Sequence, residues 1–134
     1  MLGGRFAWDS RMVMAIAGKL IALATIAGAL GAHALHSKLS ASQLEVYETA
    51  VRYHFFHALG LLGIGLAAQY KPSRTLYVAA AMVLAGVLCF SGSLYLLSFG
   101  MNFGLPLLVA LVTPLGGVLL ILGWFTFAWA VWRR

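Results

Sequence analysis

The residues best suited to chemistry in this sequence are four histidines, which form two pairs: His33 with His36, and His54 with His57. The members of each pair are three residues apart, so on a helix they would lie on neighbouring turns of one face. Four imidazole rings could bind copper, zinc or a bis-histidine haem. Because no cysteine accompanies them and no acidic ligand is clearly placed, we predict no bound metal or cofactor.

A second group of residues combines imidazole and hydroxyl side chains. Tyr53 and His57 are four residues apart, so both can point from one helical face into a bundle. A neutral histidine both donates and accepts hydrogen bonds, so His57 could bond to Tyr95 or Ser93 on a neighbouring helix. We favour structural hydrogen bonds here over a proton relay or a solute contact. The predicted polar cluster, which is also the possible ligand-binding site, comprises His33, Tyr53, His57, Ser91, Ser93, Tyr95, Thr113 and Pro114.

The sequence offers no arrangement typical of an enzyme. Ser91-Gly92-Ser93 lacks the Gly-x-Ser-x-Gly pattern of a nucleophile elbow and its strand-turn-helix context. Glu48 and Arg52 are four residues apart with the acid first, which is the favourable order for a helical ion pair. We predict that they pair at the outer membrane interface. No catalytic residue is predicted, and the chain is expected not to be an enzyme.

Composition determines the elements that must position these residues. The chain has 134 residues, of which 63% are hydrophobic and only 9% are charged, whereas soluble domains carry about 25% charged residues. So few charges cannot cover a globule in water, so lipid must surround the apolar surface. A membrane-spanning helix needs roughly 20 apolar residues. We therefore predict a single-domain, all-α integral membrane protein, with four transmembrane helices in one antiparallel bundle, at about 12–35, 49–69, 76–98 and 105–132.

Local signals refine these helices. Two overlapping capping boxes, Ser40 to Gln43 and Ser42 to Glu45, predict that the second helix begins before the membrane. Pro114 is expected to kink the fourth helix, because proline removes an amide donor. Small residues at helical spacing predict close helix packing, since they let backbones approach in lipid. The predicted packing positions are Ala24, Gly28, Ala32, Gly63, Ala67, Ala81, Ala85, Gly116 and Gly123.

The net charge of +6 lies at the helix ends rather than in one patch, so we predict lipid headgroups and not nucleic acid as the partner of the basic residues. The excess of Lys and Arg in short loops marks the cytoplasmic side of a membrane protein. We therefore predict that both termini are cytoplasmic and that the polar cluster lies in the outer half of the bundle. The basic residues assigned to the cytoplasmic side are Arg5, Arg11, Lys19, Lys71, Arg74, Arg133 and Arg134, against Lys38 and Arg52 outside.

Four short motifs, taken together and in this order, resemble one family. They are Gly31-Ala32-His33, Tyr53-His54-Phe55-Phe56-His57, Phe90-Ser91-Gly92-Ser93-Leu94-Tyr95, and Thr113-Pro114-Leu115-Gly116-Gly117 followed by Gly123-Trp124. The chain resembles, from its first span to Trp124, the small bacterial membrane proteins of domain of unknown function 423, the YgdD-like family. The resemblance implies a four-span fold in the inner membrane and no established activity. It implies nothing for His36 and His54, which lie outside the pattern.

Three functions remain open from the sequence. The first is a non-enzymatic scaffold or accessory subunit, as a homo-oligomer or within a larger membrane complex. The second is an oligomeric transporter or channel for a small solute, with or without proton coupling. Four-helix multidrug exporters of similar size use an acidic residue in their first span, and this first span has none. The third is a redox subunit that binds haem or metal through the histidine pairs.

Overall fold

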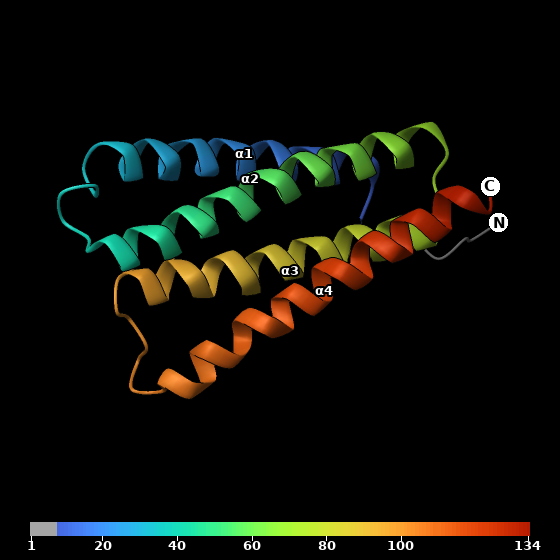
Figure 1. Cartoon of the computed structure of the whole chain (residues 1–134). Helices are drawn as coiled ribbons and strands as arrows, with labels where there is room; N and C mark the ends of the chain where they lie inside the picture. The colour runs from blue at the N-terminus through green and yellow to red at the C-terminus, as the bar shows by residue number, and fades with distance from the viewer. Residues whose placement is uncertain (1–7) are drawn as a thin grey trace.

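The computed structural model describes residues 8–134 and contains four α-helices (Figure 1). The prediction of an all-helical chain with four helices is therefore confirmed. Arg5, one of the basic residues used to predict the orientation, lies outside the described residues. The helices, joined by short connections, are α1 (Ser10–Ala32), α2 (Ala41–Tyr70), α3 (Arg74–Ser98) and α4 (Pro106–Trp132).

Side-chain caps determine where three of the helices begin. Asp9 caps α1 and Ser73 caps α3, each by accepting a hydrogen bond from an amide of the first turn. At α2 the Ser40 hydroxyl accepts from the Gln43 amide at 3.2 Å, and the Gln43 side chain accepts from the Ser40 amide at 2.9 Å. This is the predicted capping box. It confirms that α2 begins well before the predicted span at residue 49.

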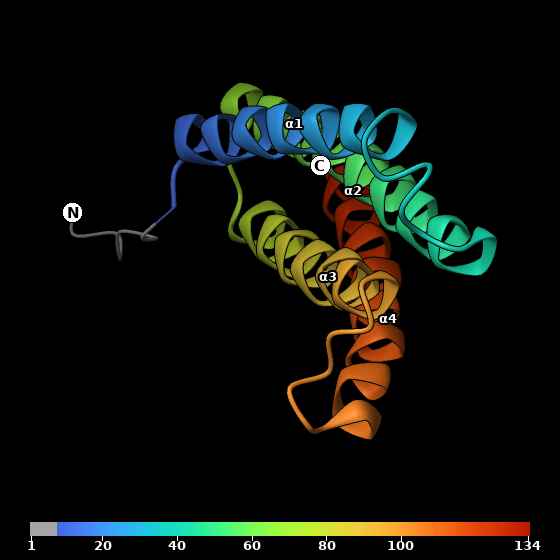
Figure 2. The ribbon, with the colours of Figure 1, turned by 90° about the vertical axis from the view of Figure 1, so that its left-hand side faces the viewer.

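The helices are arranged in chain order, so that α1 packs against α2, α2 against α3, and α3 against α4. Neighbours are antiparallel, and α4 diverges from the other helices toward its first residues (Figures 1 and 2). The predicted single bundle is therefore better described as a fan. We call the end where α1 and α3 begin the closed end, and the end where α4 begins the open end.

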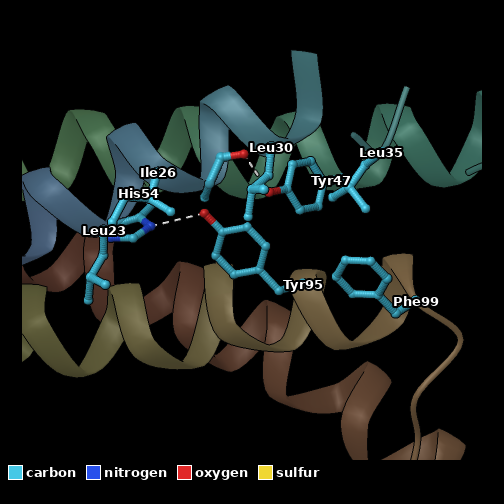
Figure 3. A pocket seen from close by; sticks show the side chains of 9 residues that line it. Leu23, Ile26, Leu30, Leu35, Tyr47, His54, Tyr95 and Phe99 are labelled. Carbon is cyan, nitrogen blue, oxygen red and sulfur yellow. Dashed lines mark hydrogen bonds between the residues drawn. The ribbon is translucent and has the colours of Figure 1, made fainter. Parts of the chain in front are cut away.

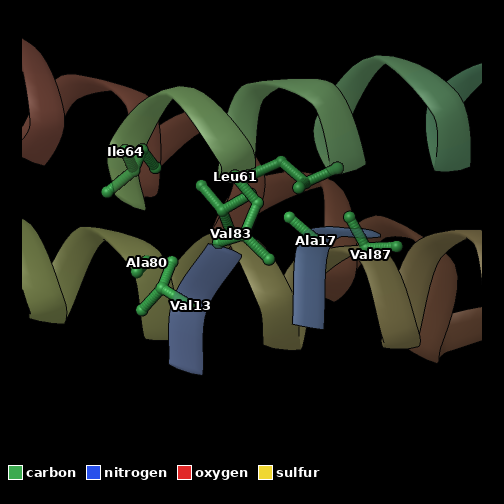
Figure 4. Close-up of a cluster of buried hydrophobic side chains, with 8 residues drawn as sticks. Val13, Ala17, Leu61, Ile64, Ala80, Val83 and Val87 are labelled. Carbon is green, nitrogen blue, oxygen red and sulfur yellow. The ribbon is translucent and has the colours of Figure 1, made fainter. Parts of the chain in front are cut away.

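The apolar core lies toward the closed end and receives side chains from all four helices (Figure 4). Elsewhere large apolar side chains are exposed, including Leu107 and Phe125, each 72% exposed on α4. Within residues 8–134, three helices, α1, α3 and α4, are long and apolar enough to cross a membrane. The core consists of Val13, Ala17, Leu61, Ile64, Ala80, Val83, Val87 and Leu120.

Glycines bring α3 and α4 into close contact. Three contacts follow one another along this pair: Gly116 with Phe90, Leu120 with Gly86, and Gly123 with Val83. The residue numbers of each pair add to the same total, as an unbroken antiparallel register requires. Gly116 and Gly123 are thus confirmed as packing positions. Gly63, which was also predicted, has no neighbouring atom within 4 Å of the place where a Cβ would stand.

The close approach of α3 and α4 predicts that substitutions of the adjacent residues Gly116 and Gly117 have different effects. A Cβ on Gly116 would overlap the Phe90 backbone, whereas one on Gly117 would lie 3.7 Å from the Phe90 ring, an ordinary contact. We expect Gly116→Ala to lower the free energy of unfolding by about 1–3 kcal/mol, as overpacking does. Gly117→Ala is the matched control and should change it little. Thermal unfolding in detergent would measure both, and equal effects would contradict the register.

Candidate functional site

Polar side chains join α3 to both of its neighbours. The buried Ser91 hydroxyl of α3 donates to the Ala50 carbonyl of α2 at 2.9 Å. On the other side, Ser93 is hydrogen-bonded to Thr113 of α4. Ser93 also donates to the Phe90 carbonyl at 3.0 Å. A hydroxyl has one proton, so the Thr113 hydroxyl must be the donor to Ser93. Ser93 and Thr113 follow the same register as the glycine contacts between α3 and α4.

His57 contacts α4 rather than α3. The indole nitrogen of Trp124 donates to His57 Nδ1 at 3.0 Å, and the Trp124 ring lies against Gly60, where a Cβ would overlap it. Tyr53 stacks at an angle on His57 and on Phe90, with ring centroids 5.7 and 4.5 Å away. A pocket of about 240 Å³ lies beside these rings. Because an indole only donates, His57 Nδ1 must be the acceptor, and its proton is on Nε2 when the ring is neutral.

The third polar contact joins α2 to α3 and α1. His54 Nδ1 and the Tyr95 hydroxyl are 3.0 Å apart, and the Tyr47 hydroxyl donates to the Ala27 carbonyl of α1 (Figure 3). The rings of Tyr47 and Tyr95 meet edge to face, with centroids 5.5 Å apart. His54 is only 7% exposed, and its Nε2 is buried without a hydrogen-bond partner in the described chain. These three side chains, together with mainly apolar residues, line a groove of about 440 Å³.

The predicted polar cluster is therefore divided among several contacts. Ser93 meets Thr113, but His57 meets Trp124 instead of the expected Tyr95 or Ser93. His33 caps the end of α1 through its backbone, and its side chain is exposed. Pro114 lies inside α4, which continues as a helix on both sides of it.

The structure does not bring the two histidine pairs together. His33 and His36 are exposed in the connection between α1 and α2, whereas His54 and His57 are bonded to different helices. Among residues 8–134, no group of three or more histidine, cysteine, aspartate or glutamate side chains is placed to hold a metal ion.

The predicted ion pair between Glu48 and Arg52 does not form in the described structure. Both side chains line a small pocket of about 220 Å³ between α1 and α2, together with Gly28, Gly31 and Tyr47. Helical spacing places the two on neighbouring turns, but the rotamers of such long exposed side chains decide whether they meet. The gain from such an exposed pair is only about 0.3–0.5 kcal/mol.

Sequence reasoning missed the roles of Tyr47, His54 and Trp124. A signal was present for the first two. Tyr47, His54 and Leu61 are seven residues apart, so they share one stripe of α2, and all three are buried. A buried stripe interrupted by one tyrosine and one histidine predicts that both side chains find polar partners on other helices. No comparable signal links Trp124 to His57.

The polar contacts described above lie almost entirely within a stretch that matches a known family. A family model described as "Protein of unknown function (DUF423)" matches residues 27–117. The chain belongs to this family. The matched stretch contains the contacts of Tyr47, His54, Ser91, Ser93 and Thr113, and it ends before Trp124. The resemblance inferred from the four motifs is thus confirmed.

Named relatives agree with this assignment. The chain is 40% identical to a UPF0382 membrane protein of Staphylococcus saprophyticus over 113 residues, which cover 84% of this chain and 90% of the relative. It is 40% identical to the UPF0382 membrane protein YwdK of Bacillus subtilis over 114 residues, covering 84% and 89%. It is 37% identical to the UPF0382 inner membrane protein YgdD of Escherichia coli over 97 residues, covering 72% and 71%. No solved structure matches the chain.

These findings confirm the predicted membrane location. The relatives are named membrane proteins, and the relative from Escherichia coli is named an inner membrane protein. The exposed apolar side chains and the three apolar helices also fit a chain that is surrounded by lipid. The family has no established function.

The place of Trp124 over Gly60 can be tested with two glycines of α2. Gly60→Ala should displace the indole from His57 and lower the unfolding midpoint in detergent, because the new Cβ would overlap the ring. Gly63→Ala is the control, since nothing lies within 4 Å of its Cβ position. In a Trp124→Phe background the penalty of Gly60→Ala should shrink. An equal penalty in both backgrounds would contradict the contact.

Proposed function

We propose that this chain is a non-enzymatic membrane protein, a scaffold or accessory subunit, in which the polar side chains hold the helices in register. The observation that supports this is a buried or partly buried hydrogen bond at every junction between neighbouring helices. Tyr47 joins α2 to α1, Ser91 joins α3 to α2, and Thr113 joins α4 to α3. The hydroxyls of Tyr47 and Ser91 donate to backbone carbonyls of neighbouring helices, which supports a structural role for both side chains.

His57 is the residue that best separates this proposal from proton-coupled transport. Its Nδ1 lone pair is occupied by the Trp124 indole proton. Protonation at Nδ1 would place two donors against each other and break this bond, because an indole cannot accept. Such a bond is worth about 0.6–1.7 kcal/mol in a membrane. A proton relay through His57 would have to break it at each transfer, which favours a structural role.

The test compares two substitutions of His57. Asparagine offers an acceptor oxygen at roughly the position of Nδ1 but cannot carry a proton, whereas alanine offers neither function. We expect His57→Ala to lower the stability by about 0.6–1.7 kcal/mol and His57→Asn to recover most of the loss, measured by thermal unfolding in detergent.

Proton flux into liposomes that contain the purified protein provides the second readout. A structural His57 predicts no flux above that of empty liposomes in the original chain or in either variant. Proton flux that both His57→Ala and His57→Asn abolish would contradict the proposal and support a transporter.

We also propose that all four helices cross the membrane, with the closed end in the cytoplasm. Helices α1 and α3 both begin at the closed end (Figure 1). If both cross the bilayer, α2 must cross back between them, although it carries more polar residues. The closed end also holds the basic residues Lys71, Arg74, Arg133 and Arg134, and the positive-inside rule favours the cytoplasm for it.

Labelling of single cysteines tests this topology in a Cys89→Ala background. Ser37→Cys and Met101→Cys lie in exposed connections at the open end, and Lys71→Cys lies in the connection at the closed end. We expect a membrane-impermeant maleimide to label the first two in intact spheroplasts and the third only after permeabilisation. Labelling of Lys71→Cys in intact spheroplasts would contradict the orientation. Opposite accessibility of Ser37→Cys and Met101→Cys would contradict the four crossings.

A further inference from the structure

The pocket of about 240 Å³ beside the contact between His57 of α2 and Trp124 of α4 is walled largely by aromatic rings. Tyr53 and Trp124 line it, together with Phe90 of α3, whose ring centroid is 4.5 Å from that of Tyr53. Two of the lining side chains are open to the outside, since Tyr53 is 38% exposed and Ile121 is 57% exposed. In a membrane protein such side chains face lipid, so a molecule dissolved in the bilayer can enter the pocket.

His57 brings a free hydrogen-bond donor to this pocket. The Trp124 indole donates to His57 Nδ1 at 3.0 Å, and an indole cannot accept, so the proton of the neutral imidazole is on Nε2. Among residues 8–134 this N–H has no hydrogen-bond partner. The one fully buried side-chain nitrogen or oxygen without a partner in that range is His54 Nε2, so His57 Nε2 is accessible. His57 therefore offers a donor and no free acceptor.

An unpaired N–H is costly inside a bilayer, where no water is present to accept from it. Helix α2 runs from Ala41 to Tyr70, so His57 lies near its midpoint. If α2 crosses the membrane, as proposed above, His57 lies deep in the hydrocarbon core, which is about 30 Å thick. The ester carbonyls of phospholipids lie at the edge of this core. An acceptor at the depth of His57 therefore belongs to a molecule dissolved in the core, and this step alone rests on the proposed topology.

The walls of the pocket favour a flat ring as its occupant. Aromatic side chains pack well against other rings in offset or edge-to-face contacts, and three of them line the pocket. The volume is below the roughly 300–1,000 Å³ of drug-sized sites, so the pocket suits one small ring. None of the residues that line it, all of which the structure describes, carries a formal charge when His57 is neutral. The occupant is therefore expected to be uncharged.

We propose that this pocket binds an uncharged flat ring that bears a carbonyl oxygen, a compound of the quinone class dissolved in the bilayer. The ring lies among the aromatic side chains, and its carbonyl accepts the proton of His57 Nε2. A hydrocarbon ring of the same shape lacks the acceptor. A carboxylate would lose its hydration without a cationic partner, which is costly inside a bilayer. The bond between His57 and Trp124 stays intact, so binding is compatible with the structural role of His57.

The test is equilibrium binding of radiolabelled duroquinone to the purified full-length chain in detergent, with empty micelles as the blank. Durene has the same flat ring and the same methyl groups but no carbonyl oxygen. We expect saturable binding of duroquinone, and competition by durene about three- to tenfold weaker, in line with the loss of one hydrogen bond. Equal competition by the two, or no saturable binding, would overturn the proposal. The assay does not depend on membrane topology, so its outcome is separate from that of the cysteine labelling.

Replacing His57 by asparagine separates the proposed donor from the structural bond. Asparagine keeps an acceptor for Trp124, but its side chain is too short to place a donor at the position of Nε2. We expect His57→Asn to weaken the binding of duroquinone about three- to tenfold and to abolish the preference for duroquinone over durene. The loss should occur although the variant unfolds at nearly the original temperature. A preference that survives in folded His57→Asn would overturn the assigned donor.

Two adjacent residues of α4 locate the pocket. Ile121→Trp should fill it and abolish binding, whereas Leu122→Trp, at a 47% exposed position that does not line the pocket, should not. Thermal unfolding shows which variants have folded, and only these are compared. Binding that survives Ile121→Trp would overturn the assigned place. A disulfide-linked dimer formed through Ile121→Cys in a Cys89→Ala background, together with no binding of duroquinone, would assign the pocket to a second copy of the chain and overturn the proposal.

Discussion

A polar side chain within a bilayer has no water to bond with, and this constraint shapes the arrangement of the helices. Each neighbouring pair of helices is joined by at least one hydrogen bond from a side chain: Tyr47 to α1, Ser91 to α2, and Thr113 to Ser93. In a bilayer, moving an apolar helix surface from contact with lipid tails to contact with another helix gains little free energy, because both surroundings are apolar. Packing and hydrogen bonds must therefore determine which helix meets which, and at what register.

The two ends of the fan meet this requirement in different ways. At the closed end, small residues let the backbones approach, and all four helices contribute to one apolar core. The C-terminal Arg134 adds to this end by donating to the Ala67 and Lys71 carbonyls where α2 ends, and the Ala67 carbonyl also accepts from the Lys71 amide. Toward the open end α4 diverges, and the hydrogen bonds of Tyr47, Ser91 and Ser93 to neighbouring helices lie on this side of the core.

The two histidines of α2 show how residues close together on one helix can have different hydrogen-bond partners. His57 accepts from an indole, and this leaves its Nε2 proton as a donor. His54 lies deeper, on the buried stripe of α2, where Tyr95 bonds to its Nδ1 and its Nε2 is buried without a hydrogen-bond partner in the described chain. Their different partners follow from the rotation of α2 about its axis, which turns one ring toward α4 and the other toward α1 and α3.

The sequence by itself determined the helices, the membrane and the family. Runs of apolar residues, the cap at Ser40 and four short motifs depend on neighbours along the chain, so they can be read without a fold. Only the tertiary structure decided that His57 meets Trp124, that His54 meets Tyr95, and that His33 stays outside the polar contacts. Helical periodicity tells which face a side chain lies on. Its partner depends on the rotation and register of a second helix, which packing over the whole length of both helices decides.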